Sequence, residues 1–119
     1  VMATFPTPDR ALAAALRIRE AMHTLNAENN REDLLLKIGL HEGPCLAVML
    51  NDRLDYFGQS VNIAARVQGL SVSSSIFATA PVVEHLAATR LLDAAGLKPV
   101  AQRHQLRGIA NELTVYEIA

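Results

Sequence analysis

Residues 38–44 of the chain read IGLHEGP, and residues 55–66 read DYFGQSVNIAAR. The first segment completes an apolar run over residues 34–40, which indicates a buried strand, and its glycine–proline pair turns the chain. Residues 45–50 fit a second strand, so we expect these two strands to pair as a hairpin. The polar segment 51–54 fits the tip or an arm of this hairpin, and the second quoted segment leads from its glycine into a helix.

Two polar side chains of the predicted helix fall on one face. Asn62 and Arg66 are four residues apart, which places them side by side. An amide and a guanidinium in this arrangement can hold ribose and phosphate oxygens, because arginine makes paired, charge-assisted hydrogen bonds to phosphate. Asp55 precedes the turn into the helix and can accept a hydrogen bond from an exocyclic amine such as that of adenine. The spacing alone also fits a solvated helix surface, so that alternative stays open.

The flanking sequence predicts one α+β domain. Residues 7–9, Thr-Pro-Asp, are typical of a helix start, and apolar residues at steps of three and four continue this helix to about residue 26. Shorter elements are expected farther on: a strand at 76–78, a helix at 79–87, and strands at 102–106 and 113–118. This order predicts a mostly antiparallel sheet with helices on one face. A length of 119 residues, half of them apolar, suits a single core.

Composition and charge exclude several classes of function. A net charge of −1 offers no electrostatic attraction to nucleic acid or to an anionic membrane. The longest apolar runs fall far short of a membrane span, and no signal peptide is recognisable. The single cysteine, Cys45, excludes an internal disulfide, and we expect it in the core. The chain has no GxxxxGK[ST] loop, and no second histidine follows four positions after His41, which argues against a P-loop or a zinc motif.

Both quoted segments resemble the signatures of class III adenylate and guanylate cyclase catalytic domains. Residues 38–44 match the strand and turn written I-G-[IL]-H-x-G-P, and residues 55–66 match D-x-[WF]-G-x-x-V-N-x-A-[AS]-R. The apolar opening, residues 1–5, resembles the strand that follows the family's second metal-binding aspartate, and residues 106–117 fit the end of the domain. The resemblance implies a ferredoxin-like cyclase homology fold truncated at the N-terminus, with residues 1–119 forming a partial catalytic domain.

The resemblance also implies roles for individual residues. Asp55 corresponds to the base-selecting position, where a carboxylate favours adenine, Asn62 to the residue that orients the ribose, and Arg66 to the one that stabilises phosphate charge. The implied reaction converts ATP to cyclic AMP and pyrophosphate with Mg²⁺ or Mn²⁺, held by two aspartates that would precede Val1. No metal ligand is therefore expected in this chain, which would be inactive alone. The intact protein would be a cytoplasmic signalling homodimer, without nucleic-acid binding and without membrane contact from this segment.

Departures from the family pattern leave two alternatives open. Phe57 stands where the family often has tryptophan, residues 109–111 lack the phosphate-binding lysine of some members, and Lys37 is on a different strand from the base-selecting lysine. One alternative is a catalytically silent cyclase-homology module for dimerisation or nucleotide sensing. The other is a diguanylate cyclase on a related fold, against which the absence of a GGDEF run argues.

Overall fold

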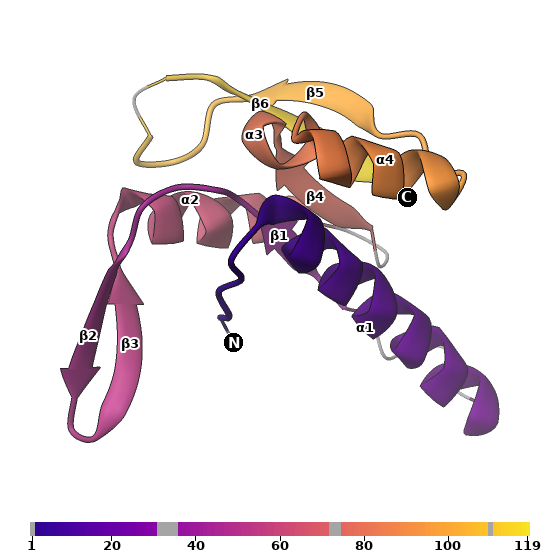
Figure 1. Ribbon diagram of the computed structural model, residues 1–119, viewed down its shortest axis with the longest axis horizontal. Coiled ribbons are helices and arrows are strands. Elements are labelled where there is room, and N and C mark those ends of the chain that lie inside the picture. The colour runs from indigo at the N-terminus through magenta and orange to yellow at the C-terminus, as the bar shows by residue number, and fades with distance from the viewer. Residues whose placement is uncertain (1, 31–35, 72–74, 110) are drawn as a thin grey trace.

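The computed structural model describes residues 2–30, 36–71, 75–109 and 111–119. Figure 1 shows the helices and strands of these ranges. In chain order they are α1 (Pro8–Glu28), β1 (Ile38–Leu40), β2 (Leu46–Leu50), β3 (Arg53–Phe57), α2 (Gln59–Gln68), β4 (Ile76–Thr79), α3 (Ala80–Val83), α4 (Leu86–Ala94), β5 (Val100–His104) and β6 (Leu113–Ile118). Part of the expected first strand, residues 34 and 35, lies outside the described residues. The single helix expected at 79–87 is replaced by α3 and the start of α4.

Four strands form one sheet in the order β1-β4-β6-β5. β1 runs parallel to β4, with Leu40 beside Ala78, whereas β4 with β6 and β5 with β6 are antiparallel. This confirms the expected α+β class with a mostly antiparallel sheet. β4 lies inside the sheet, and all of its residues are buried. The end of β4 therefore offers a rigid support for side chains of its neighbour β1.

β2 and β3 form a separate two-stranded hairpin, which projects from the rest of the molecule (Figure 1). The pairing expected from the sequence, between residues 34–40 and 45–50, is wrong. β1 pairs instead with β4 and so joins the core, and β2 pairs with β3. Asn51 and Asp52 connect β2 to β3, and their φ angles of 50° and 61° are both positive. Positive φ at both central residues is what a tight type I′ hairpin turn requires.

Hydrophobic side chains fill both faces of the four-stranded sheet. One core lies under α1, α3 and α4 and includes Leu12, Ile76, Ala78, Leu92 and Ile118. A smaller core lies under α2 and consists of Val67, Phe77, Leu106 and Val115. Successive residues of β4 thus point into opposite cores, as the alternation of a strand dictates. The expectation that all helices lie on one face of the sheet is therefore wrong, because α2 covers the other face.

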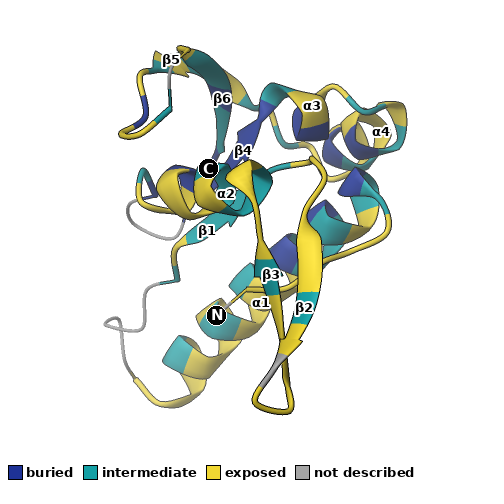
Figure 2. Ribbon diagram, turned by 90° about the vertical axis from the view of Figure 1, so that its left-hand side faces the viewer, coloured by how far each residue is buried: buried dark blue, intermediate teal, exposed yellow. Residues whose placement is uncertain are grey.

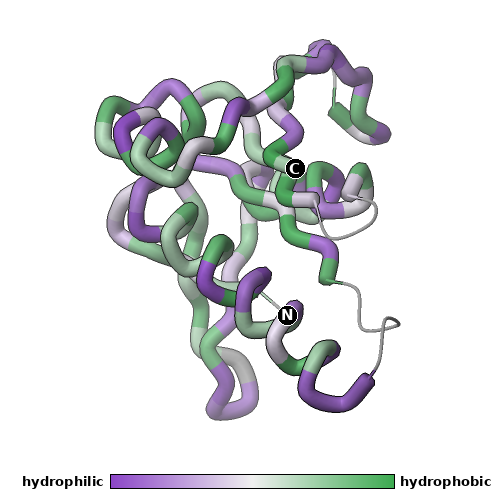
Figure 3. Tube along the Cα trace, turned by 90° about the vertical axis from the view of Figure 1, so that its right-hand side faces the viewer, coloured by the Kyte–Doolittle hydropathy of each residue, from purple (hydrophilic) through white to green (hydrophobic). Residues whose placement is uncertain are grey.

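The segment before α1 does not join either sheet. Residues 2–5 are strand-like in sequence, but they lie outside the strands of the described chain, and Met2 and Phe5 are exposed. α1 begins as expected, with Thr7 at the N-cap and Pro8 in the first turn. Hydrophobic and hydrophilic residues alternate along the whole helix (Figure 3), but only residues in its N-terminal half are buried. None of the described helices combines the length and hydropathy needed to cross a membrane.

Candidate functional site

The projecting hairpin carries Asp55. This residue lies opposite Val48 in the β2–β3 ladder, and its side chain is exposed, like most of the hairpin (Figure 2). The backbone N–H of Tyr56 donates a hydrogen bond of 2.9 Å to Oδ1 of Asp55. One carboxylate oxygen is thus held toward the strand, and the carboxylate as a whole is open to a ligand from solvent.

A single glycine joins this strand to α2. Gly58 has φ of 135°, a value that side chains rarely permit, and it is the N-cap of the helix. Its carbonyl oxygen accepts a hydrogen bond of 3.2 Å from the backbone N–H of Asn62. The helix therefore starts directly after the glycine of the second quoted segment. Because the connection is so short, Asp55 and the first turn of α2 form one local unit.

Asn62 and Arg66 lie on the exposed face of α2. Both side chains are exposed, whereas Val67 on the face toward the sheet is fully buried. The two residues are four apart on a continuous helix, so they are neighbours on its surface, as the sequence predicts. Arg66 also lies in the last turn of the helix, where a positive charge is favoured by the helix dipole. This face presents an amide and a guanidinium to solvent.

Two glycines fix the other face of α2 against the end of β1. A β-carbon on Gly39 would lie 2.6 Å from the Cα of Gln68 and 2.8 Å from the carbonyl oxygen of Ala64, both on α2. A β-carbon on Gly43 would overlap the hydroxyl of Ser60 in the first turn of the same helix. The sequence indicated Gly43 only as part of a turn. Its contact with the helix could not be read from local sequence, because it depends on how α2 packs.

His41 lies between these two glycines and contacts the end of β4. Its Nδ1 atom is 2.7 Å from Oγ1 of Thr79, so the two side chains share a hydrogen bond. His41 is half buried, and this burial lowers the pKa of its ring, while the charge of Glu42 opposes the shift. The sequence indicated only that His41 and Glu42 do not begin a zinc motif. Thr79, which is buried, was not identified from the sequence as a residue of the site.

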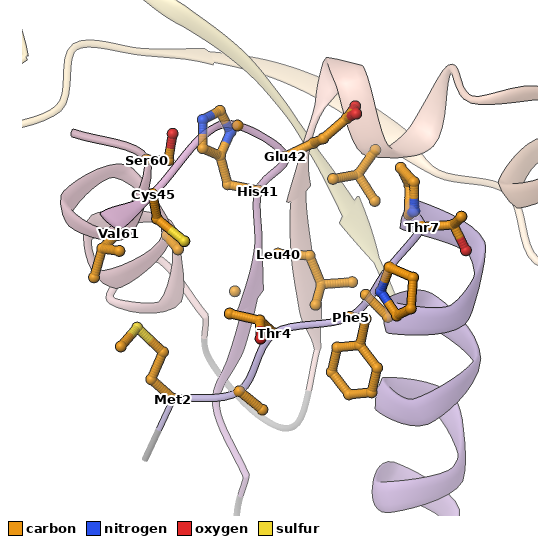
Figure 4. Close-up of a pocket in the computed structure, with 18 residues that line it drawn as sticks. Met2, Thr4, Phe5, Thr7, Leu40, His41, Glu42, Cys45, Ser60 and Val61 are labelled. Carbon is orange, nitrogen blue, oxygen red and sulfur yellow. The ribbon is translucent and has the colours of Figure 1, made fainter. Parts of the chain in front are cut away.

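A pocket of about 240 Å³ opens between residues 2–8, the end of β1 and the start of α2 (Figure 4). Mostly apolar side chains line it, among them Met2, Phe5, Leu40 and Val61. Cys45 also lines it and is exposed, so the expectation of a core position for this cysteine is wrong. Neither Asp55 nor the Asn62 and Arg66 face belongs to the lining. The candidate residues thus lie on an open surface and not in this pocket.

The described part of the chain does not offer a metal centre. Across residues 2–30, 36–71, 75–109 and 111–119, no three histidine, cysteine, aspartate or glutamate side chains are grouped closely enough to hold an ion. Asp55 lies on the strand before α2, and the exposed face of that helix carries an amide and a guanidinium, which are groups that bind anions and hydroxyls. The arrangement therefore suits a nucleotide better than a cation.

Comparison with known proteins shows the family and the fold of the chain. The adenylate and guanylate cyclase catalytic domain family matches the chain over residues 8–118. A comparison with curated protein sequences finds no match. Among solved structures, the fold is similar to an adenylate/guanylate cyclase/hydrolase from Silicibacter pomeroyi, with 24% identity and a TM-score of 0.74 over 97% of this chain and 64% of that one.

Two further structures share the fold at lower identity. The adenylyl cyclase CyaB from P. aeruginosa is 17% identical, with a TM-score of 0.74 over 94% of this chain and 58% of that one. The guanylate cyclase domain of RhGC from Catenaria anguillulae, in complex with GTP, is 21% identical, with a TM-score of 0.64 over 94% of this chain and 59% of that one. The chain belongs to the adenylate and guanylate cyclase catalytic domain family. It spans less than two thirds of the length of each of these structures.

Proposed function

We propose that the intact protein is a nucleotidyl cyclase that converts ATP to cyclic AMP and pyrophosphate, and that this chain supplies the substrate-binding side of the active site. One observation carries the proposal. Asn62 and Arg66 share the exposed face of α2, and Asp55 lies on the strand that leads directly into that helix. Their functional groups suit the ribose, the phosphates and the base of one nucleotide.

In the proposed reaction, the ribose 3′-oxygen attacks the α-phosphorus. The new bond between the 3′-oxygen and phosphorus forms as the bond from the α-phosphorus to the bridging oxygen breaks. Pyrophosphate leaves with the electron pair of that bond, and the hydroxyl proton passes to solvent. Negative charge builds on the phosphate oxygens, and the Arg66 guanidinium can pair with two of them. Asn62 orients the ribose, because its amide can both donate to and accept from hydroxyl groups.

Asp55 is proposed to select the base. An ionised carboxylate only accepts hydrogen bonds, so it pairs with the amino group of adenine and meets the six-position carbonyl of guanine as a second acceptor. One similar structure is a guanylate cyclase domain in complex with GTP. The choice of ATP for this protein therefore rests on Asp55 alone.

A second copy of the domain is the proposed partner. The β2–β3 hairpin exposes Leu46 and Met49 at 64% each and Leu54 at 56%, and an isolated two-stranded hairpin is only marginally stable in water. Exposed apolar surface of this kind marks an interaction site. In a head-to-tail homodimer, the hairpin would be covered, and catalytic groups of the partner copy would face Asn62 and Arg66.

Divalent ions, Mg²⁺ or Mn²⁺, would offset phosphate charge and activate the attacking hydroxyl in such an enzyme. Among the described residues, no three metal-binding side chains are grouped closely enough to hold an ion. We therefore assign no metal ligand to this chain and propose that the chain alone is inactive. The same observation favours the second candidate function, a catalytically silent cyclase-homology module that dimerises or senses nucleotides.

The two functions are separated by an assay of the intact protein with ATP or GTP and Mg²⁺ or Mn²⁺. We expect cyclic AMP as the main product, and we expect Asn62→Ala to lower kcat by about tenfold to a hundredfold through loss of ribose orientation. Gln59→Ala is the matched control, because Gln59 is also an exposed amide on α2, and it should leave kcat unchanged. Binding of ATP without any cyclic product would instead establish the silent module.

A further inference from the structure

His41 is attached to the buried end of β4. The parallel register places Leu40 beside Ala78, so the next residues along the two strands, His41 and Thr79, are neighbours. Their side chains share the 2.7 Å hydrogen bond between Nδ1 and Oγ1. Thr79 is only 1% exposed, so this bond ties the half-buried ring to an immobile part of the core.

The Thr79 hydroxyl does not cap the helix that follows it. Thr79 is the N-cap residue of α3, where a threonine side chain ordinarily accepts a hydrogen bond from the first turn of the helix. No such capping bond is made here, and the hydroxyl contacts His41 instead. A capping bond of this kind is ordinarily worth about 1 kcal/mol, so the contact with His41 replaces a common source of helix stability.

The backbone around His41 follows α2 along its length. Gly39, two residues before His41, touches the C-terminal half of the helix, and Gly43, two residues after it, touches the first turn at Ser60. Nε2 of His41 also lies 3.6 Å from the point where a β-carbon on Gly43 would stand. Figure 4 shows the His41 ring and Ser60 at the same end of the pocket. His41 therefore supports the bend of backbone that receives the first turn of α2.

The first turn of α2 is also where the proposed active-site face begins. Asn62 is anchored there through its backbone N–H to Gly58, and it lies two residues from Ser60, on the opposite side of the helix. A shift of the turn at Ser60 therefore moves Asn62 by a similar distance. We propose that His41, held by Thr79, is a positioning residue that fixes the first turn of α2 and with it the orientation of Asn62 and Arg66. This inference rests on the proposed function, because it assigns His41 to the same site.

The polarity of the ring fits this role. Burial lowers the pKa of His41 below the ordinary value of 6.5, so the ring is neutral at neutral pH, and Glu42 opposes the shift only in part. A neutral half-buried ring needs one partner for Nδ1, and Thr79 provides it. Loss of that partner leaves Nδ1 of the half-buried ring unpaired, which favours a different position of the ring and of the adjoining backbone.

The test compares Thr79→Val with Thr79→Ser in the intact protein. Valine keeps the shape of threonine without the hydroxyl, and serine keeps the hydroxyl. A misplacement of reacting groups by about 1 Å can cost up to a hundredfold in rate, so we expect Thr79→Val to lower kcat by about tenfold while KM changes by less than about threefold. Thr79→Ser should recover most of kcat. Hydrogen–deuterium exchange over residues 58–66 should be faster in Thr79→Val than in the wild type or in Thr79→Ser.

The possible outcomes test the role of His41 separately from the proposed cyclase function. An unchanged kcat and unchanged exchange in Thr79→Val would overturn the role of His41, as would an equal loss of kcat in Thr79→Val and Thr79→Ser. If the wild type forms no cyclic nucleotide, the proposed function fails, and the exchange data alone decide whether His41 fixes α2. If Thr79→Val does not fold, His41→Leu replaces it, with His41→Asn as the variant that retains a polar atom near the Nδ1 position and should behave like the wild type.

Discussion

The backbone of Gly39 in β1 lies directly against the backbone of Gln68 in α2, so closely that a β-carbon on Gly39 would come within 2.6 Å of the Gln68 Cα. Neither partner of this contact is a flexible side chain that can move away. The contact sets the distance between the sheet and the helix that carries Asn62 and Arg66.

Gly39→Ala should therefore destabilise the protein. The added methyl group must push α2 away from β1, and overpacking of this kind costs about 1–3 kcal/mol or more. Gly69→Ala is a suitable control, because Gly69 has helical φ of −64° and its nearest contact for a new β-carbon is 3.3 Å away. Urea unfolding of both variants measures the difference. Equal free energies of unfolding for the two variants would show that the close approach is not rigid.

Arg66→Ala should remove activity without removing the fold. In the intact protein we expect kcat to fall by about a hundredfold or more, because a charge partner of the transition state is lost. The side chain is exposed, so the melting temperature should barely change. Arg90→Ala, an exposed arginine on α4, serves as the control and should keep full activity. A large loss of stability together with a small loss of kcat would assign Arg66 to the fold instead of the site.

Asp55→Ala should erode the preference for ATP over GTP. An unpaired buried polar group costs about 1–3 kcal/mol, so Asp55 can supply about tenfold to a hundredfold of discrimination once a nucleotide covers it. The measurement is the ratio of kcat/KM for ATP and GTP in the intact protein, with Asp93→Ala on α4 as a control for an exposed carboxylate. If Asp55 only supports the strand through its bond to Tyr56, both substrates will slow alike and the ratio will not move.

The purified chain of 119 residues should form no cyclic AMP from ATP with Mn²⁺. The reason is that the proposed function assigns no metal ligand to this chain, whereas divalent ions would activate the attacking hydroxyl. The assay needs the intact protein as a positive control under the same conditions. Clear turnover by the 119-residue chain would show that the catalytic ions find ligands within it.

The stability of the protein should depend on the protonation of His41. Its pKa is lowered by burial from the ordinary value of 6.5, so the unfolded chain binds a proton more readily than the folded one. The free energy of unfolding therefore falls as the pH drops from 6.5 toward the lowered value of the folded state. The melting temperature should follow this decline, and His41→Asn, which cannot be protonated in this range, should decline less. Identical pH profiles of the two proteins would contradict the assignment.

The sequence predicted the elements around the site better than their partners. The apolar run that ends in β1 and the apolar period of α2 are local signals, so both elements and the shared face of Asn62 and Arg66 could be predicted. The predicted pairing of β1 with residues 45–50 was wrong, because the actual partner, β4, is far along the chain. The turn at Asn51 and Asp52, two residues that tolerate positive φ, was the local signal for the β2–β3 hairpin.

The contacts that hold α2 and His41 in place could not be predicted from local sequence. Gly39 and Gly43 are small because α2 approaches them, and the position of α2 follows from the second core beneath it. The bond between His41 and Thr79 likewise joins two strands that are separate in sequence. Such contacts depend on tertiary packing, so the pattern of residues in one segment cannot predict them.

The proposed pairing of two copies through the exposed hairpin would also link folding to concentration. The hairpin side chains Leu46, Met49 and Leu54 stay more than half exposed on the folded monomer, so they gain little from folding of a single chain. A partner that covers them binds only the folded state and so stabilises it by mass action. With a second copy as that partner, the melting temperature rises with the concentration of the protein itself. The level of expression in a cell would then set how much of the protein is folded, as well as how much of it is paired.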